Sequence, residues 1–504
     1  MTGPEGTPTR FVIAGGGSAG WIAAAVLARA LPPFAAEITL VESEEIGIIG
    51  VGEATVPLIG ELNRFLGIHE PEFVAATNGT FKLGIEFVDW AEVGNRHFHG
   101  FGDFGADIAG LPAHQYWLRL NREQALPPLD EWSMPHALAS RDRFAPHEAL
   151  SGEAAQFRHA FHFDAALYAA YLRRLAEGQG VTRIEGRIEG VERDGASGHV
   201  TALALADGRR VAGDVFLDCT GFASRLLSGS LGVPFEDWSH WLPCDRAAAV
   251  PSARAGRFTP FTRSTAKAAG WQWRIPLQSR TGNGHVYASR FLSDDEAVAQ
   301  LLAGLDGEPL AEPRLLRFTP GRRARFWEGN VIAIGLAAGF LEPLESTAIQ
   351  LIQTGVNRLL DLLPTARPDP ALAAEYNRQT ALEYERIRDF IIAHYCRTRR
   401  PEPLWRQVAA MELPETLAAK LGTWDASGRV PLYDLESHQE PSWVSVLVGQ
   451  GVLPRAVHPR ASHPPADQLG ALMEQRRAFL AQAAQRMPDH ARFIARTCAS
   501  PVPA

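Results

Sequence analysis

FVIAGGGSAGWIAAAVLARALPPFAAEITLVE, residues 11–42, is the stretch that decides the fold. It begins with a short apolar run at residues 11–14, as expected for a strand that is buried on both faces of a parallel sheet. A glycine-rich turn follows, and residues 21–31 are mostly helix formers without a breaker. A second strand at residues 38–41 leads to Glu42. Strand, glycine turn, helix, strand and acid in this order predict a dinucleotide-binding unit.

Each part of this unit has a physical task. Gly15, Gly17 and Gly20 satisfy the pattern G-x-G-x-x-G, which allows a tight turn and a close approach to a pyrophosphate at the helix N-terminus. Glu42 lies 22 residues after Gly20 (42 − 20), where a carboxylate can accept hydrogen bonds from a ribose. Ser18 also completes a G-x-S-x-G match, but only 17 residues precede it, too few for the strands that a nucleophile elbow requires.

The composition of the chain excludes several classes of protein. A length of 504 residues suggests two to four domains, and a net charge of −8 argues against a nucleic-acid partner. The four cysteines include no C-x-x-C pair, so neither a disulfide framework nor a metal site is indicated. No signal peptide is recognisable, and no apolar run approaches the ~18 residues of a membrane span. We therefore expect a cytoplasmic protein with no membrane partner.

Lysine is unusually rare in this chain. Of the 49 basic residues only Lys82, Lys267 and Lys420 are lysines. Residues 81–87 alternate as in a strand, with Lys82 and Glu86 on the face opposite the apolar side chains. Taken alone, this pattern indicates a solvated charge pair.

Residues 270–277, GWQWRIPL, form a second notable strand, with residues 284–289 as its expected partner. Trp271 and Trp273 would point the same way and form one aromatic wall. Taken alone, this strand indicates the core of a sheet.

Earlier in the chain, the apolar residues of 158–177 have the spacing of a helix.

Residues 329–348 form a third notable stretch, in which a buried strand leads to Glu345-Ser346-Thr347 and a helix at 348–363. Ser346 or Thr347 is the expected N-cap, so free backbone N–H groups there could hold an anion. Beyond Pro370 a long helix carries apolar and aromatic residues at a spacing typical of packing.

Three of these pieces together resemble the flavin-dependent tryptophan halogenase family. They are the glycine motif of residues 15–20, the W-x-W-x-I-P of residues 271–276 and the EPLEST of residues 342–347. Residues 50–57, GVGEATVP, and the strand that carries Lys82 also look like that family. The match runs from the N-terminus to about residue 400.

The resemblance implies an α/β fold with a Rossmann-like FAD-binding domain of the flavin monooxygenase type, an interleaved substrate module and C-terminal helices. We expect residues 1–365 to form the FAD-binding domain, interrupted by substrate-covering segments at about 96–155 and 235–325. Residues 366–504 would form a mainly helical covering region. A homodimer is one option for the assembly.

The resemblance also implies an oxidoreductase that uses O₂ and chloride or bromide to halogenate an electron-rich aromatic such as indole or tryptophan. Reduced FAD (FADH2) would come from a separate flavin reductase, and hypohalous acid would pass through an internal tunnel to a lysine. Lys82 matches that lysine; an amine can polarise hypohalite or form a haloamine, whereas Arg does not readily form an amine. Glu345 matches the acidic partner, which positions the oxidant and takes the proton from the ring.

The family resemblance assigns binding residues as well. Backbone groups of Thr347 and Ala348 match the halide site. FAD contacts are expected at Gly15, Gly17, Ser18, Ala19, Gly20, Glu42, Gly50, Val51, Ala54, Gly335 and Leu344. The tunnel and substrate chamber are expected at His99, Phe101, Trp271, Trp273, Ile275, Pro276, Ser346 and Trp443.

Two departures leave the substrate and halide open. Tryptophan-specific members usually have Gly where this chain has Ala348, and the C-terminal third shows no pattern for gripping an amino acid. Free indole and tryptophan therefore both stay open, and bromide, which is easier to oxidise, could be preferred over chloride.

Two other functions are alternatives. A single-component flavin hydroxylase shares the FAD fold, but usually has Gly-Asp where this chain has Gly335-Leu336. A non-catalytic flavoprotein would need neither Lys82 nor Glu345.

Overall fold

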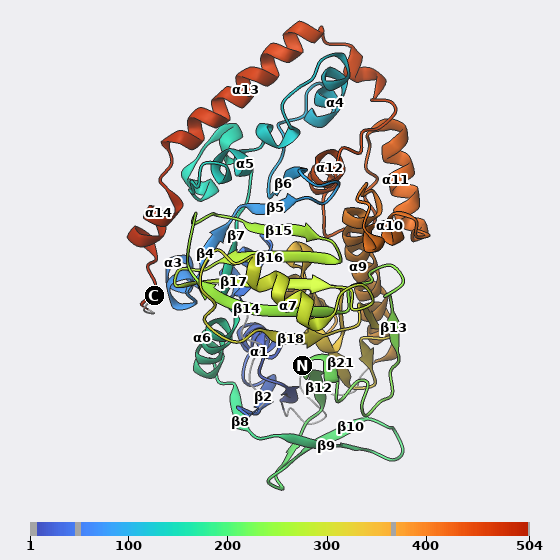
Figure 1. The fold of residues 1–504 in the computed structure, drawn as a ribbon. Helices are drawn as coiled ribbons and strands as arrows, with labels where there is room; N and C mark the ends of the chain where they lie inside the picture. Colours follow the sequence, from blue (N-terminus) through green and yellow to red (C-terminus); the bar gives the residue numbers. More distant parts are fainter. Residues whose placement is uncertain (1–7, 46–51, 364–368, 502–504) are drawn as a thin grey trace.

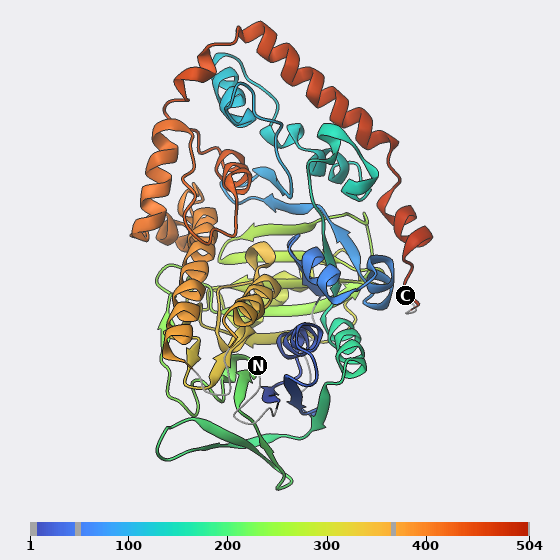
Figure 2. The same cartoon turned by 180° about the vertical axis from the view of Figure 1, so that it is seen from behind.

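The computed structural model describes residues 8–45, 52–363 and 369–501, in which two large sheets lie beneath a helical cover (Figure 1 and Figure 2). The first sheet has the strand order β20-β21-β12-β1-β2-β8. Its central strand β1 runs parallel to both neighbours, and Ile13 lies opposite Leu40 and Leu217. The elements are β1 (Thr9–Ala14), α1 (Ser18–Ala30), β2 (Ala36–Glu42), β8 (Thr182–Glu185), β12 (Val215–Asp218), β20 (Trp327–Glu328) and β21 (Val331–Ala333). The predicted βαβ unit and the Rossmann-like α/β fold are confirmed.

The second sheet has seven strands in the order β18-β14-β17-β16-β15-β5-β6 and lies between the first sheet and the helices at the top of Figure 1. All its neighbours are antiparallel except β15 and β5. The tryptophan strand β16 pairs with β17, as its sequence predicts. The strands are β5 (Gly84–Val88), β6 (Arg96–Gly100), β14 (Arg246–Ala253), β15 (Thr262–Lys267), β16 (Gly270–Pro276), β17 (Arg280–Tyr287) and β18 (Arg314–Arg317).

A small sheet of β3 (Gly52–Ala54), β7 (Ala160–Asp164) and β4 (Thr80–Lys82) contacts the second sheet. The single strand expected at residues 81–87 is therefore wrong in one respect, because the chain changes sheets at Leu83. Leu83 donates its N–H to the Pro260 carbonyl at 2.8 Å, outside either ladder, and β5 then begins at Gly84. A side chain at Gly84 would meet the His99 carbonyl oxygen at 2.3 Å, so only glycine allows β6 to approach so closely.

The helix that the spacing of residues 158–177 predicts is also only partly right. Residues 160–164 form β7, and α6 (Ala165–Gly178) starts after it. Asp164 sets this boundary, because its carboxylate accepts hydrogen bonds from the N–H groups of Ala166 and Leu167.

The helical cover comes mainly from the C-terminal part of the chain. The long helix α9 (Pro370–Cys396) runs beside the second sheet, and α13 (Ala466–Arg486) crosses over α4 and α5 (Figure 1). The side chains of α9 that were expected to pack, such as Tyr384 and Ile391, are buried. No helix among the described residues is long and apolar enough to cross a membrane. The domain division given above stays a prediction.

The remaining helices are α2 (Ile59–Leu66), α3 (Glu70–Ala76), α4 (Ala113–Glu123), α5 (Met134–Ala139), α7 (Asp294–Ala303), α8 (Ala348–Asp361), α10 (Pro403–Ala409), α11 (Glu415–Ser427), α12 (Glu440–Gly449) and α14 (His490–Thr497). Seven short 3₁₀ turns include η6 (Leu344–Ser346) among the described residues. Two small sheets complete the fold: β9 (Ile188–Arg193), β10 (Val200–Leu205) and β11 (Arg210–Ala212); and β13 (Phe235–Asp237), β19 (Gly321–Arg323) and β22 (Gly339–Phe340).

Candidate active site

The glycine turn between β1 and α1 has the geometry of a pyrophosphate cradle. Gly15 has φ +107°, and a Cβ there would lie 2.4 Å from the Cys219 carbonyl oxygen. Gly17 is the N-cap of α1, without a capping side chain, and a Cβ on it would meet nothing within 4 Å. The first N–H groups of α1, at Ser18 and Ala19, therefore have no capping side chain. The residues present fit a dinucleotide.

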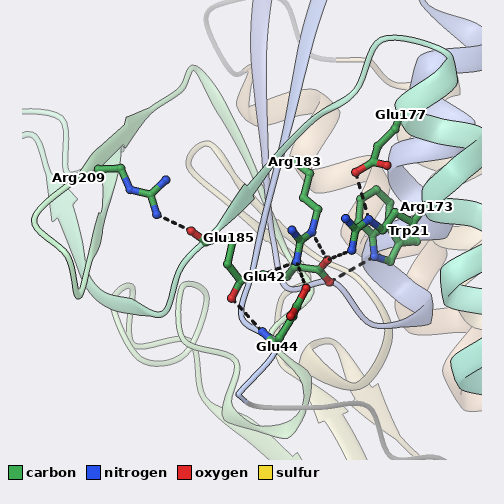
Figure 3. A network of polar contacts seen from close by, with 8 residues as sticks. All are labelled: Trp21, Glu42, Glu44, Arg173, Glu177, Arg183, Glu185 and Arg209. Atoms are coloured by element: carbon green, nitrogen blue, oxygen red, sulfur yellow. Dashed lines mark hydrogen bonds and ion pairs between the residues drawn. The ribbon is translucent and has the colours of Figure 1, made fainter.

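Glu42 lies directly against this turn, at the end of β2. Figure 3 shows its carboxylate between Trp21 Nε1, at 3.3 Å, and Arg183 Nε, at 2.6 Å. Arg183 also pairs with Glu44 at 3.0 Å and with Glu185 at 2.5 Å. The carboxylate is thus oriented by the protein itself, with 15% of the side chain left exposed for a ribose to approach.

The other residues expected to contact FAD are Gly335, Ala54, Leu344, Gly50 and Val51. Gly335 packs on the start of α1, because a Cβ on it would lie 2.8 Å from the Ala19 Cβ. Ala54 and Leu344 are buried. Gly50 and Val51 lie outside the described residues.

Lys82 is completely buried. The solvated pair of Lys82 and Glu86 that the alternation alone indicates is therefore wrong. Its ammonium donates hydrogen bonds to the Thr55 carbonyl and to Ser346 Oγ, both at 2.9 Å, and lies 5.2 Å from the centre of the Phe101 ring. Burial lowers the pKa of Lys82 to about 7, although the charge of Glu345 acts in the opposite direction. Glu86, in contrast, makes ion pairs with two arginines near the surface.

The EPLEST turn holds Glu345 and Ser346 in an unusual backbone conformation. Their φ angles are +66° and +61°, two successive left-handed residues that are not glycine. Each costs about 1–3 kcal/mol, so the conformation persists only because the surrounding contacts enforce it. The turn directs Ser346 Oγ to Lys82 and the Glu345 carboxylate to two histidines, so the strained pair joins the two expected catalytic groups.

The carboxylate of Glu345 is buried between His99 and His394. His394 Nε2 lies 2.9 Å from Oε1, and His99 Nδ1 lies 3.0 Å from Oε1 and 2.9 Å from Oε2. Burial opposes ionisation, but the charges and hydrogen bonds of His99 and His394 hold the pKa of Glu345 well below its usual range. His394 was not predicted as a site residue.

A cavity of about 500 Å³ opens beside these groups. His99, Phe101 and Glu345 line it, together with Arg358 from α8 and residues of the 435–442 segment. The expected chamber residue Trp443 is completely buried, with its ring 4.6 Å from Lys420 Nζ, and does not line this cavity.

The aromatic wall is built as expected. Trp271 and Trp273 are both buried on β16, with ring centres 6.2 Å apart. Trp271 Nε1 and the Tyr395 hydroxyl both donate to Glu342 Oε1, at 3.2 Å and 2.8 Å. Burial raises the pKa of Glu342 to about 8, which keeps this carboxyl largely neutral at pH 7.

The rest of the tryptophan strand connects the wall to the lysine strand. Ile275 and Pro276 are buried or nearly so, and the Pro276 carbonyl accepts a hydrogen bond from Thr80 Oγ1 at 2.7 Å. Thr80 stands two residues before Lys82 on β4.

The expected halide residues are at the start of α8. Thr347 is the N-cap of that helix, as predicted, but its side chain makes no capping hydrogen bond. Thr347 is buried and Ala348 is half-buried. The N–H groups of this first turn thus have no capping side chain, as an anion site requires.

Residues 10–466 match the family model described as tryptophan halogenase. The chain is 34% identical over 479 residues to tryptophan 6-halogenase SttH of Streptomyces toxytricini. This alignment covers 88% of this chain and 90% of that protein. It is 33% identical over 517 residues to tryptophan 7-halogenase RebH of Lentzea aerocolonigenes, over 94% of this chain and 97% of that protein.

The solved structure of Xcc4156, a flavin-dependent halogenase from Xanthomonas campestris, is similar with a TM-score of 0.95. The two chains share 46% identity, over 99% of this chain and all (100%) of that chain. With the flavin cradle, the tryptophan wall and the EPLEST turn in place, these matches show that the chain belongs to the flavin-dependent tryptophan halogenase family of oxidoreductases.

Proposed function

We propose that this chain halogenates an electron-rich aromatic, such as free indole or tryptophan, in the chamber beside Lys82 and Glu345. The burial of the Lys82 amine carries the proposal, because within the part of the chain that the structure describes its hydrogen bonds go to two neutral oxygens and to no carboxylate. An isolated buried amine is costly for stability and is typical of a functional site.

Reduced FAD, when bound, would supply the electrons with which O₂ and a halide are converted to hypohalous acid. Gly15, Gly17 and Glu42 would hold the dinucleotide, and the N–H groups of Thr347 and Ala348 would hold the halide. Trp271 and Trp273 would keep the organic substrate away from the flavin. The passage from the flavin to Lys82 stays a prediction.

The Lys82 amine would then receive the halogen. The amine and hypohalous acid give a haloamine and water, and attack by the ring carbon on the halogen breaks the N–halogen bond. The nitrogen regains a proton, and Glu345 accepts the proton that the ring loses. Alternatively, the ammonium form would polarise hypohalous acid through a hydrogen bond; a pKa of about 7 favours the amine route because it leaves about half the side chains uncharged at neutral pH.

A turnover assay tests the proposed function. The chain is incubated with FAD, a flavin reductase, NADH and bromide, and is offered indole, tryptophan and pyrroles. We expect brominated product by mass spectrometry. Direct oxidation of NADPH with a hydroxylated product would favour the hydroxylase instead.

We predict that bromide is used in preference to chloride, because bromide is easier to oxidise. With both halides at equal concentration, the product measured by mass should be mainly brominated. A mainly chlorinated product would contradict this prediction.

The pH dependence of product formation should follow the fraction of Lys82 that is in the uncharged amine form. The pKa is lowered to about 7, so the uncharged fraction rises as the pH rises through that value. Product formed per hypohalous acid should increase about tenfold per pH unit below pH 7 and level off above it. Oxidant captured by a free trap at each pH is the control. A ratio that falls with rising pH would mean that the ammonium form acts.

The Glu42→Ala variant should bind FAD less tightly. Loss of hydrogen bonds to a charged group costs about 1.5–3 kcal/mol, or roughly a 10–100-fold higher Kd. Flavin fluorescence titration measures this. Glu44→Ala removes an exposed partner of the same Arg183 and should leave the Kd unchanged. Equal effects of the two substitutions would place the ribose elsewhere.

A further inference from the structure

His394 on α9 is completely buried, and both of its ring nitrogens have oxygen partners. Nδ1 lies 2.8 Å from the Phe390 carbonyl oxygen, and Nε2 lies 2.9 Å from Glu345 Oε1. Turning the ring over would put carbon atoms against both oxygens and lose both contacts. The two partners therefore fix the position of each nitrogen.

These contacts require one proton more than a neutral histidine and a carboxylate carry. A carbonyl oxygen only accepts, so the contact with Phe390 places a proton on Nδ1. A neutral imidazole has a single N–H, so Nε2 would then present a lone pair to Glu345 Oε1. Two acceptors would face each other at 2.9 Å. A second proton must therefore lie between His394 and Glu345.

The partners of the carboxylate favour its ionised form. His99 Nδ1 lies 3.0 Å from Oε1 and 2.9 Å from Oε2, so Glu345 is approached by nitrogen atoms from two sides. His99 Nε2 has no hydrogen-bond partner among the residues that the structure describes. A carboxylate that accepts several N–H groups is stabilised as the anion.

The other titratable groups around the pair do not supply the balancing charge. Burial lowers the pKa of His97 and of His438 to about 3, so both are neutral near pH 7. Lys82 is only partly charged at that pH, and its hydrogen bonds go to Thr55 and Ser346. His99, the other imidazole on this carboxylate, can donate from Nδ1 as a neutral ring, because its Nε2 has no partner among the described residues that would require a proton. His394 can donate to Glu345 only as the imidazolium, because its Nδ1 proton is already used by the Phe390 carbonyl.

We propose that Glu345 and His394 form a carboxylate–imidazolium pair at neutral pH, in which His394 is a positioning residue that keeps the buried Glu345 carboxylate ionised. Its role in accepting the ring proton rests on the proposed function. The ion pair itself is inferred from the contacts of His394 with Phe390 and Glu345, so it does not depend on bound flavin or substrate.

The protonation of His394 can be measured directly by NMR on the full-length chain labelled with ¹⁵N-histidine. We expect both ring nitrogens of His394 to be protonated at neutral pH, as the two contacts require. In Glu345→Gln, whose amide can donate to Nε2, His394 should become neutral. The loss of one set of ring signals in His394→Gln assigns them to His394. A neutral wild-type His394, with a proton on Nδ1 alone, would overturn the proposal.

His490 is a matched internal control. Its Nδ1 also lies against a backbone carbonyl, that of Phe258 at 3.1 Å, but its Nε2 accepts the N–H of Phe81 at 3.3 Å. It must therefore be neutral with a proton on Nδ1, and its signals give the neutral pattern. The NMR result stands whether or not the chain halogenates any substrate, so this test and the turnover assay fail independently.

A kinetic measurement tests the role of the pair. His394→Gln offers a neutral N–H in place of the cation, so the pKa of Glu345 should rise. In the pH–rate profile for product formation, the limb near pH 7 that belongs to Lys82 should stay in place. The steeper fall at lower pH that marks protonation of Glu345 should begin about one pH unit or more higher than in the wild type, while oxidant formation is unchanged. A merely structural role would lower the rate equally at all pH values, and that outcome would refute the positioning role.

Discussion

Lys82→Ala should abolish halogenated product while hypohalous acid continues to form. The amine is the proposed carrier of the halogen, and its removal leaves its former partners, Ser346 Oγ and the Thr55 carbonyl, which cannot take over this role. Losing an activated nucleophile of this kind should cost about 10³-fold or more in product formation. Product is measured by mass, and the oxidant is measured with a free trap in the same reaction.

Lys267→Ala is the matched control for this variant. Lys267 is half-buried at the end of β15, where its carbonyl accepts the Trp405 indole N–H, and it does not share the Ser346 contact of Lys82. Its replacement should change neither the oxidant nor the product. Aryl bromination that survives in Lys82→Ala would remove Lys82 from the role assigned to it.

Glu345→Gln should slow product formation by about 10²–10⁴-fold, the usual contribution of a positioned general base. The amide has nearly the same shape as the carboxylate but cannot accept the ring proton. Because the contacts with His99 and His394 can be kept by an amide, the fold should persist, and thermal unfolding checks this.

Glu345→Asp separates basicity from position. It keeps the charge but is one methylene shorter, so it cannot keep both contacts of 2.9–3.0 Å with the histidines. An intermediate rate is expected. A wild-type rate in the Gln variant would mean that the ring proton goes to another acceptor.

The βαβ unit with its glycine turn could be predicted from sequence because its elements are close together in the chain. Strand, glycine turn, helix and acid all fall within residues 9–42, and each has a local signature. The aromatic wall was predictable for a similar reason, since the alternation of a single strand places Trp271 and Trp273 on one face.

The environment of Lys82 could not be read from the same kind of pattern. The alternation of residues 81–87 predicts that Lys82 and Phe81 lie on opposite faces of a strand. It does not predict whether other parts of the chain bury the face that carries Lys82. The EPLEST turn covers it through Ser346, which comes from 264 residues farther along the chain. The change of sheet at Leu83 likewise depends on Pro260 and β6, which no local signal announces.

His394 shows the same limit on a helix. It lies 49 residues from Glu345, inside a run of buried side chains whose spacing indicates packing alone. A histidine in such a run is usually a core residue, and only the folded chain brings it to the carboxylate.

The paired left-handed residues also determine how this scaffold can be diversified. Glu345 and Ser346 are neighbours in one rigid turn, so the proton acceptor and the anchor of the amine keep a constant spacing. The 435–442 segment, which also lines the cavity, belongs to a different region of the chain. Apart from His438, which stacks on Phe390, its residues can therefore be substituted to admit other aromatic substrates without changing the turn that holds Glu345 and Ser346.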